Sequence, residues 1–518
     1  MINQSNHTIT STLMSLNLDL PSIENNPALL AEVRPNKIAE FIEKIPFNNI
    51  FSAATVLLEE MQILNRQKVS ADNRINALEL YRPVLIRITS EISTHYINNS
   101  VMPMPAKVKS CASAAELLWM ELGYGYKLAW SDINSKHLNL TADKASALVL
   151  QRAIDSMSQL SLVYYNLYFT LPASIWSDLH HLYFSAAQQN LENIEVTDSH
   201  SKSGSSTISL AYIHALLVSL AGPQHLAKSD IQRASDYLSN LAQLGLIRGI
   251  GTLESPSGIF VIKLDSSQAP IPFTKRTSEP NSSNDVLLVT LDIARKMHLH
   301  LKTLQDNKVP SDGSLRADAL DSHDEDLLTH LIKHLAITPK RIFSRVNKNH
   351  KVELAFGIAE IDQLFNPSAK SIAKPSVWQV QNTSATGFAL RKFQPGEISI
   401  KVGDFVAMKE SAESAWSILV LRWINADEQN KIDIGLQLLA PSVNVVGIKS
   451  VKLVSFEKAL ILSEISPLKQ PMTIVTSRGM YSPAEVFDLS QNGTTTQVLA
   501  TKLLERTAGF ERFQFSLI

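Results

Sequence analysis

Five residues in one stretch of the chain have side chains and spacing suited to binding a nucleotide. Arg341 and Arg345 stand four residues apart, and Asn382, Ser384 and Gly387 follow in an Asn-x-Ser-x-x-Gly pattern. Guanidinium groups bind phosphate through paired hydrogen bonds and stack on purine rings. An amide and a hydroxyl can hydrogen-bond a base edge, and glycine permits a tight turn or the close approach of a ligand. Together these residues suit a small, doubly charged purine nucleotide.

The residues around these side chains alternate between apolar and polar types. Short alternating runs cover 352–358, 398–402 and 432–438, and Pro395-Gly396 and Gly403-Asp404 interrupt them. Alternation with a period of two over several short runs predicts a small antiparallel β-barrel. The two arginines would lead into this barrel.

The motif and the strand pattern together resemble the PilZ domain, a bacterial receptor for cyclic di-GMP. The resemblance covers residues 338–447. It implies that the two arginines hold the phosphates and guanines and that the Asn-x-Ser-x-x-Gly turn completes the pocket. The two halves of the motif are far apart here, with an extra loop near 366–375.

Two further basic residues are candidates for the same site. Lys340 precedes the first arginine, and Arg391 follows the turn. Arg391 either adds positive charge beside the ligand or belongs to an ordinary solvated strand edge.

Composition limits the class of protein. A chain of 518 residues is too long for one hydrophobic core, which predicts about two to four domains. Lys+Arg 48 against Asp+Glu 49 gives no global basicity that would indicate nucleic acid or anionic membrane. The single cysteine, Cys111, excludes an internal disulfide and fits a reducing compartment. Without a signal-peptide pattern or a membrane-length apolar run, the sequence predicts a cytoplasmic protein.

The N-terminal half has the pattern of helices. Residues 1–27 are polar and expected to be flexible, and 28–195 carry apolar residues at helical spacing. No sustained repeat of ~34 residues occurs, so we expect an irregular α-helical bundle or solenoid. Such surfaces usually bind proteins.

Residues 207–336 form a second helical region. After a loop at 197–206, helices are expected at 209–220 and 228–244, followed by a β-hairpin over 246–264. Helices followed by a hairpin are also typical of a winged-helix unit, although the balanced charge argues against nucleic acid as the partner.

The rest of this region is expected to lead into the barrel. It comprises a linker at 266–285, a helix over 286–304, and a helix that begins with the capping box Ser322-His323-Asp324-Glu325. That last helix runs through His334 and leads into the arginine segment.

Residues 451–518 read as a further β unit. Asn492-Gly493 is a strong hairpin signal, and Phe513, Phe515 and Leu517 alternate near the end. This unit carries no ligand motif and is expected to pack against the first barrel.

Other patterns do not indicate chemistry. His330 and His334 have metal-binding spacing, but Leu331 stands where the metalloprotease motif needs Glu. No P-loop, GxGxxG or GxSxG pattern occurs, and Cys111 lies in an apolar context typical of a core residue. We therefore expect no enzyme, no metal site and no cofactor.

The sequence thus predicts an α+β multidomain protein with a mostly helical N-terminal half, a C-terminal PilZ-like antiparallel barrel and a further β unit. The resemblance implies a bacterial cyclic di-GMP receptor that couples ligand binding to a helical protein-interaction domain and controls motility, pili, secretion or biofilm. One alternative is an adaptor or scaffold whose barrel has lost its ligand. Another is a nucleic-acid regulator that uses residues 209–264.

Overall fold

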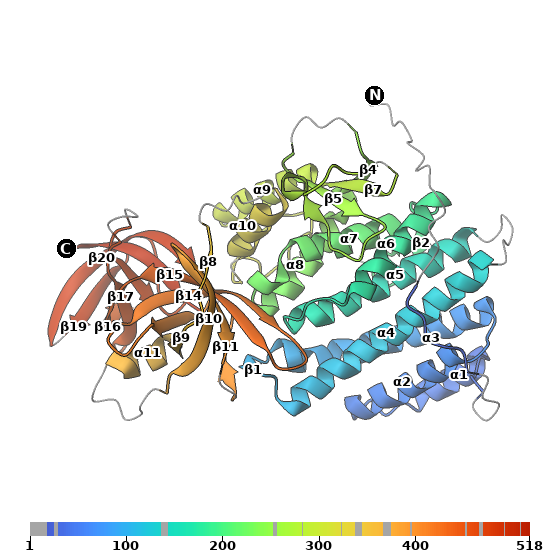
Figure 1. Ribbon diagram of the computed structural model, residues 1–518, viewed down its shortest axis with the longest axis horizontal. Helices are drawn as coiled ribbons and strands as arrows, with labels where there is room; N and C mark the ends of the chain where they lie inside the picture. Colours follow the sequence, from blue (N-terminus) through green and yellow to red (C-terminus); the bar gives the residue numbers. More distant parts are fainter. Residues whose placement is uncertain are drawn as a thin grey trace. The chain divides into compact units, whose positions relative to one another are not determined.

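The structure is a computed structural model of the chain. It describes residues 18–24, 30–135, 143–201, 203–251, 256–281, 283–322, 324–336, 344–365, 374–393, 396–450, 453–465, 470–491, 493–507 and 509–518. The chain divides into two compact units (Figure 1). The first contains residues up to Pro339 apart from two short segments, Ser100–Pro105 and Gln224–Ala227, which belong with Lys340–Ile518 in the second.

The first unit consists mainly of α-helices, as predicted. They are α1 (Pro35–Glu43), α2 (Ile50–Arg66), α3 (Ala71–Ile97), α4 (Ala106–Ser135), α5 (Asp143–Asn166), α6 (Ala173–Gln188), α7 (Ile208–Leu220), α8 (Lys228–Leu241), α9 (Leu291–Gln305) and α10 (Asp324–Leu335). The long helices α3, α4 and α5 lie side by side (Figure 1). Polar side chains cap several helices: Asn49 accepts hydrogen bonds from the first turn of α2, Ser70 from that of α3 and Thr207 from that of α7.

A small antiparallel sheet in the first unit differs from the predicted hairpin. Its strands, in the order β4-β7-β5-β6, are β4 (Leu246–Gly249), β7 (Asp285–Val289), β5 (Ile259–Lys263) and β6 (Ile271–Pro272). The prediction of a hairpin over 246–264 is therefore wrong, because β4 and β5 both pair with β7 and not with each other. Residues 286–289 belong to a strand and not to the helix predicted there. A short, fully apolar run fits a buried strand as well as a helix, so periodicity alone cannot separate them.

The predicted linkers also contain structure. Residues 266–285 include β6, the 3₁₀ turn η3 (Phe273–Lys275) and the first residue of β7. In the loop at 197–206, β2 (Val196–Thr197) pairs with β3 (Ser205–Ser206). The polar composition of this loop predicted flexibility, but Asp198 within it is bonded to two arginines of the long helices.

The first β structure of the second unit is a ring of antiparallel strands. Its members are β9 (Lys351–Phe356), β10 (Ser376–Ser384), β11 (Gly387–Lys392), β15 (Ile432–Ala440), β14 (Ser417–Ala426) and β13 (Phe405–Lys409). The pairing of β10 with β11 closes the ring, and the short strand β8 (Val346–Asn347) adds to β10. The prediction of a barrel at this place is confirmed.

Two details of the predicted barrel are wrong. Ile358 lies in the helix α11 (Gly357–Phe365), because the strand ends at Phe356 and Gly357 has a φ of 78°. In the run 398–402, only β12 (Ile398–Ser399) is a strand, and it pairs with β1 (Val101–Met102) instead of a strand of the ring.

A second, closed barrel follows. Its strands are β16 (Val443–Ser450), β17 (Glu457–Leu462), β18 (Thr473–Thr476), β21 (Glu511–Leu517), β20 (Thr494–Arg506) and β19 (Val486–Gln491). Gln491 pairs with Thr494 across the predicted tight turn, where Gly493 has a φ of 82°; Asn492 lies outside the described residues. The α+β class, with two C-terminal β units, is confirmed.

The two barrels share a hydrophobic core. The rings of Phe405 and Phe510 lie 4.0 Å apart between centroids, within a buried cluster drawn from both barrels. At the margin, Arg422 forms an ion pair with Glu505 at 2.5 Å. Among the described residues, no helix is long and apolar enough to cross a membrane.

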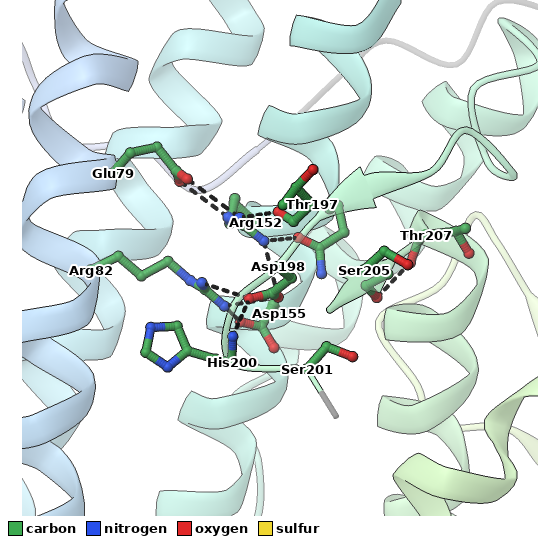
Figure 2. Close-up of polar contacts among 12 residues, drawn as sticks. Glu79, Arg82, Arg152, Asp155, Thr197, Asp198, His200, Ser201, Ser205 and Thr207 are labelled. Atoms are coloured by element: carbon green, nitrogen blue, oxygen red, sulfur yellow. Dashed lines mark hydrogen bonds and ion pairs between the residues drawn. The ribbon is translucent and has the colours of Figure 1, made fainter. Parts of the chain in front are cut away.

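Buried ion pairs connect the long helices of the first unit. Arg82 of α3 donates to both carboxylate oxygens of Asp198, at 3.0 and 3.1 Å, and to Asp155 of α5 at 3.0 Å. Arg152 of α5 donates to Asp198 at 3.0 Å and to Glu79 at 3.0 Å. Figure 2 shows Asp198 between the two guanidinium groups. Asp198 therefore ties the 197–206 segment to two helices.

Replacing Asp198 with alanine is expected to destabilise the first unit strongly. Both buried guanidinium groups would lose a shared carboxylate, and breaking a buried pair in this way costs about 3–5 kcal/mol. Chemical denaturation followed by circular dichroism measures this loss. Asp292→Ala is the matched control, since Asp292 pairs with Arg295 at an exposed position and should contribute less than about 1 kcal/mol. Equal effects of the two substitutions would contradict the assignment.

Asp404 gives the second unit a predictable response to pH. Burial raises the pKa of this carboxyl from 3.8 to about 6, although it accepts a hydrogen bond from the Lys401 amide at 2.7 Å. The folded chain thus holds this proton more tightly than the unfolded chain does. Stability from this group is full below about pH 4 and is lost as the pH rises through about 6.

Asp404→Asn should therefore stabilise the second unit at pH 7 by about 1–3 kcal/mol, because the amide carries no charge to desolvate. Urea denaturation at pH 4, 5, 6 and 7 tests this. The gap between variant and wild type should widen with pH; a gap that stays constant would show that the carboxyl does not titrate as described.

Candidate functional site

The Asn-x-Ser-x-x-Gly motif forms the hairpin between β10 and β11. Asn382 and Ser384 end β10, and Gly387 begins β11 directly opposite Ser384. The Ser384 hydroxyl donates to the Gly387 carbonyl at 3.4 Å, across the turn. Asn382 and Ser384 are partly exposed, so both side chains can reach a ligand on the surface.

Strand β8 brings the arginine segment to this hairpin. Val346 pairs with Thr383, and Asn347 pairs with Asn382. Arg345 directly precedes β8 and is exposed. The long spacing does not separate Arg345 from the hairpin, because β9 and α11 occupy much of the intervening chain. Lys340 and Arg341 lie outside the described residues.

A β-bulge adjusts β10 where it meets β8. Val380 pairs with Leu390 and Asn382 with Ala389, so Gln381 has no opposite residue on β11. The Gln381 carbonyl instead accepts a hydrogen bond from the Lys348 amide at 3.3 Å. A bulge bends a strand and changes the direction of its side chains. Here it separates the buried Val380 from the partly exposed residues that follow.

The segment after β8 and the middle of β10 border a polar hollow of about 610 Å³. Its lining residues are Asn347, Lys348, Asn349, Gln379, Val380, Gln381, Asn382 and Arg391. The structure thus brings two predicted residues, Asn382 and Arg391, to one hollow. The other predicted residues that are described lie close to lining residues in sequence. These are Arg345, two residues before Asn347, and Ser384 and Gly387, which follow Asn382.

Apart from Asn382, the amides of this hollow and its lysine were not predicted from the sequence. Asn347, Lys348 and Asn349 follow Arg345 directly, and this polar run was a signal that such residues continue the site. Gln379 and Gln381 carried no comparable signal, because polar residues that alternate with the apolar Trp378 and Val380 fit the outer face of any strand.

Arg391 is held by a carboxylate. Its guanidinium donates to Asp433 at 2.7 and 3.0 Å, and the hydrogen bond to Asp433 raises the pKa of Arg391. The charge of Arg391 is therefore balanced within the barrel. Lys348 and Arg345 supply the excess positive charge of the described residues beside the hollow.

Three family models match this chain along its length. Residues 362–444 match the model described as "Cyclic-di-GMP receptor FimW, middle PilZ domain". The barrel is a PilZ domain. Residues 36–248 match the N-terminal domain of the same receptor, and 447–518 match the FimW C-terminal β-barrel domain.

A relative that aligns with nearly the whole chain is the cyclic-di-GMP receptor FimW of Pseudomonas aeruginosa. The two chains are 20% identical over 592 aligned positions, which cover 99% of this chain and 94% of the relative. The match to the PilZ model includes Asn382, Ser384 and Gly387 and begins after Arg345.

The paired histidines of α10 have structural contacts. Their rings stack at 4.3 Å, and His330 Nε2 lies 2.7 Å from the Ala221 carbonyl oxygen. Within the described ranges, no group of three or more His, Cys, Asp or Glu side chains could hold a metal ion. His330 thus contacts the backbone at the C-terminal end of α7.

Packing within the barrel requires glycine at position 387, whether or not a ligand binds. A Cβ atom at this position would lie 2.9 Å from the Leu436 carbonyl oxygen of the neighbouring strand. Because that neighbour is backbone, the strands β11 and β15 would have to separate. The glycine of the motif thus sets the closeness of the PilZ hairpin to β15.

We expect Gly387→Ala to destabilise the PilZ domain by about 1–3 kcal/mol, as forced overpacking does. Differential scanning calorimetry of the full chain measures the effect. Gly249→Ala is the control, because a Cβ there meets nothing within 4 Å. A Gly387→Ala protein as stable as the control would mean that the strands adjust freely.

Proposed function

We propose that this chain is a bacterial cyclic di-GMP receptor whose PilZ domain binds the ligand through Arg341, Arg345, Asn382, Ser384 and Gly387. The observation that carries this proposal is the pairing of β8 with β10, which joins the arginine segment to the Asn-x-Ser-x-x-Gly hairpin. The receptor named in the matched models and in the full-length relative supports the choice of ligand.

The chemistry of the hollow suits this ligand. Cyclic di-GMP carries two phosphate charges, and the exposed Arg345 and Lys348 offer charge-assisted hydrogen bonds. Asn382 and the neighbouring carboxamides can meet the edges of a guanine, since an amide both donates and accepts. Lys340 and Arg391 have supporting roles; Arg391 keeps its bond to Asp433 and presents its remaining donors.

Ligand binding would then hold Arg341 and Arg345 at the phosphates, beside the hairpin to which β8 is paired. The helical unit is the proposed output module, which binds a protein partner in the cytoplasm and controls pili, motility, secretion or biofilm. In this proposal the chain is a binding protein and not an enzyme. The domain boundaries 28–195, 207–336, 338–447 and 451–518 remain part of the proposal.

One observation favours the alternative, an adaptor whose PilZ domain does not bind the nucleotide. The matched part of the PilZ model begins at residue 362 and leaves both arginines outside it. The ligand titration below separates the two functions.

Calorimetric titration of the full chain with cyclic di-GMP should give selective binding over GTP and cyclic di-AMP. Arg341→Ala and Arg345→Ala should each weaken binding by at least tenfold, because a hydrogen bond to a charged group contributes about 1.5–3 kcal/mol. The control is Arg478→Ala, which removes an exposed arginine of the second barrel. Wild-type affinity in both arginine variants would reject the site, and no binding by the wild type would favour the adaptor.

A further inference from the structure

Strand β4 forms an open edge of the small sheet in the helical unit (Figure 1). The strand order is β4-β7-β5-β6, and within the described chain β4 pairs only with β7. Alternate residues of an antiparallel edge strand direct their N–H and C=O groups away from the sheet. These backbone groups can pair with one more strand, which is a common way for proteins to bind an extended peptide.

The sequence blocks the opposite edge of the same sheet. Strand β6 has only two residues, and the second of them is Pro272. Proline has no N–H to donate, so it is typical of an edge that does not accept another strand. Strand β4 contains four residues and no proline. Of these two edges, β4 is therefore the one that can accept a strand.

The side chains of β4 leave an apolar and a cationic position exposed. Leu246 is 55% exposed, and Arg248 is exposed two residues further along. Arg248 lies opposite Leu287, which packs in a small buried cluster with Ile259 and Val261. Since directly paired residues share a face, Leu246 and Arg248 lie on the face of that cluster. Residues opposite them on an added strand would extend the same face.

The charge of Arg248 selects the kind of strand. Its side chain forms no ion pair with any residue that the structure describes. By contrast, the exposed Arg295 of α9 is already paired with Asp292. An unpaired cation on an edge strand attracts an acidic residue directly opposite and repels a basic one.

A second copy of β4 would fit this edge poorly. Antiparallel pairing centred on Arg248 would set the two arginines opposite each other, where like charges repel. Pairing centred on Ile247 would set each Arg248 opposite a Leu246, which leaves the cation without a partner. The edge therefore favours a different strand that carries an acidic residue.

We propose that β4 binds an extended peptide of a partner protein as an added antiparallel strand, with an acidic residue opposite Arg248 and an apolar residue opposite Leu246. The strands of this sheet pair antiparallel throughout. In that direction the acidic residue comes first, so the motif reads acidic-x-apolar. Four paired residues span about 13 Å, at about 3.3 Å each. The inference rests on the proposed protein-binding role of the helical unit and assigns its site and the chemistry of its partner.

The test is affinity selection by the purified full chain from three libraries of seven-residue peptides. The first library fixes Asp or Glu at its third position and Leu, Ile or Val at its fifth. The second replaces the acidic residue with Lys or Arg, and the third exchanges the acidic and apolar positions. We expect the first library to be enriched over the other two. Fluorescence polarisation then measures the affinity of the full chain for a selected peptide.

Reversing the charge on β4 should reverse the preference. Arg248→Glu changes an exposed side chain, so the protein should fold, and thermal melting near that of wild type checks this. The variant should bind the selected acidic peptide about fivefold more weakly or worse, because an attractive pair becomes a repulsive one. It should enrich the basic library instead. The matched control is Lys68→Glu, the same change of charge at an exposed position between α2 and α3, which should bind as wild type.

The peptide backbone provides a second measurement that needs no protein variant. Only alternate N–H groups of an added strand donate to β4, so methylation of single backbone nitrogens should weaken binding at every second position of the core. No enrichment of the first library, an unchanged preference in Arg248→Glu, or tolerance of methylation throughout the core would overturn the proposal. A concentration-dependent dimer in sedimentation velocity that Arg248→Glu abolishes would assign the edge to a second copy and would overturn it as well.

The outcome can be separated from that of the proposed function. Cyclic di-GMP titration of Arg248→Glu should match wild type, since Arg248 lies in the helical unit and not in the PilZ domain. Peptide binding without cyclic di-GMP binding would reject only the proposed ligand. A protein partner that keeps its affinity for Arg248→Glu would preserve the protein-binding role and overturn β4 as its site.

Discussion

Strand β10 is the element on which the PilZ domain and its site depend. Its first half pairs with β9, its end pairs with β8, and its other edge pairs with β11 to close the ring. The change of partner from β9 to β8 falls beside the bulge at Gln381. One strand therefore both completes the barrel and aligns the arginine segment with the hairpin. A shift of β10 by one residue would exchange its buried and exposed side chains, and the site residues on β10 would no longer face the hollow.

The two units satisfy their polar groups in different ways. In the helical unit, arginines and aspartates are buried together, and Asp198 serves two guanidinium groups at once. In the PilZ domain, the bond from Arg391 to Asp433 is partly exposed. Arg345 and Lys348 form no ion pair within the part of the chain that the structure describes. A buried charge depends on its partner, because losing that partner destabilises the fold, whereas an unpaired positive charge at the surface is available to an anion.

Much of this organisation could be predicted from the sequence, because local patterns determine it. Ser70 and Asn49 start helices through their own side chains, and Asn492-Gly493 marks a two-residue turn. The Asn-x-Ser-x-x-Gly motif could likewise be recognised because its residues are close together in the sequence. What failed depended on distant pairing: β7 separates β4 from β5, and β12 pairs with a strand about 300 residues away in sequence. Neither pairing leaves a periodic signal in the segment itself.

The interleaved chain path has a practical meaning for dissecting this protein. The short strand β1 and the turn around His225 belong to the second unit although they come from the first half of the sequence. Val101 pairs with Ser399, and the ring of His225 lies 3.1 Å from the Arg422 carbonyl oxygen. A fragment that begins at residue 340 would lack both, and a fragment that ends there would carry them without their partners. No single cut yields the two units whole, so their functions are best studied in the full chain.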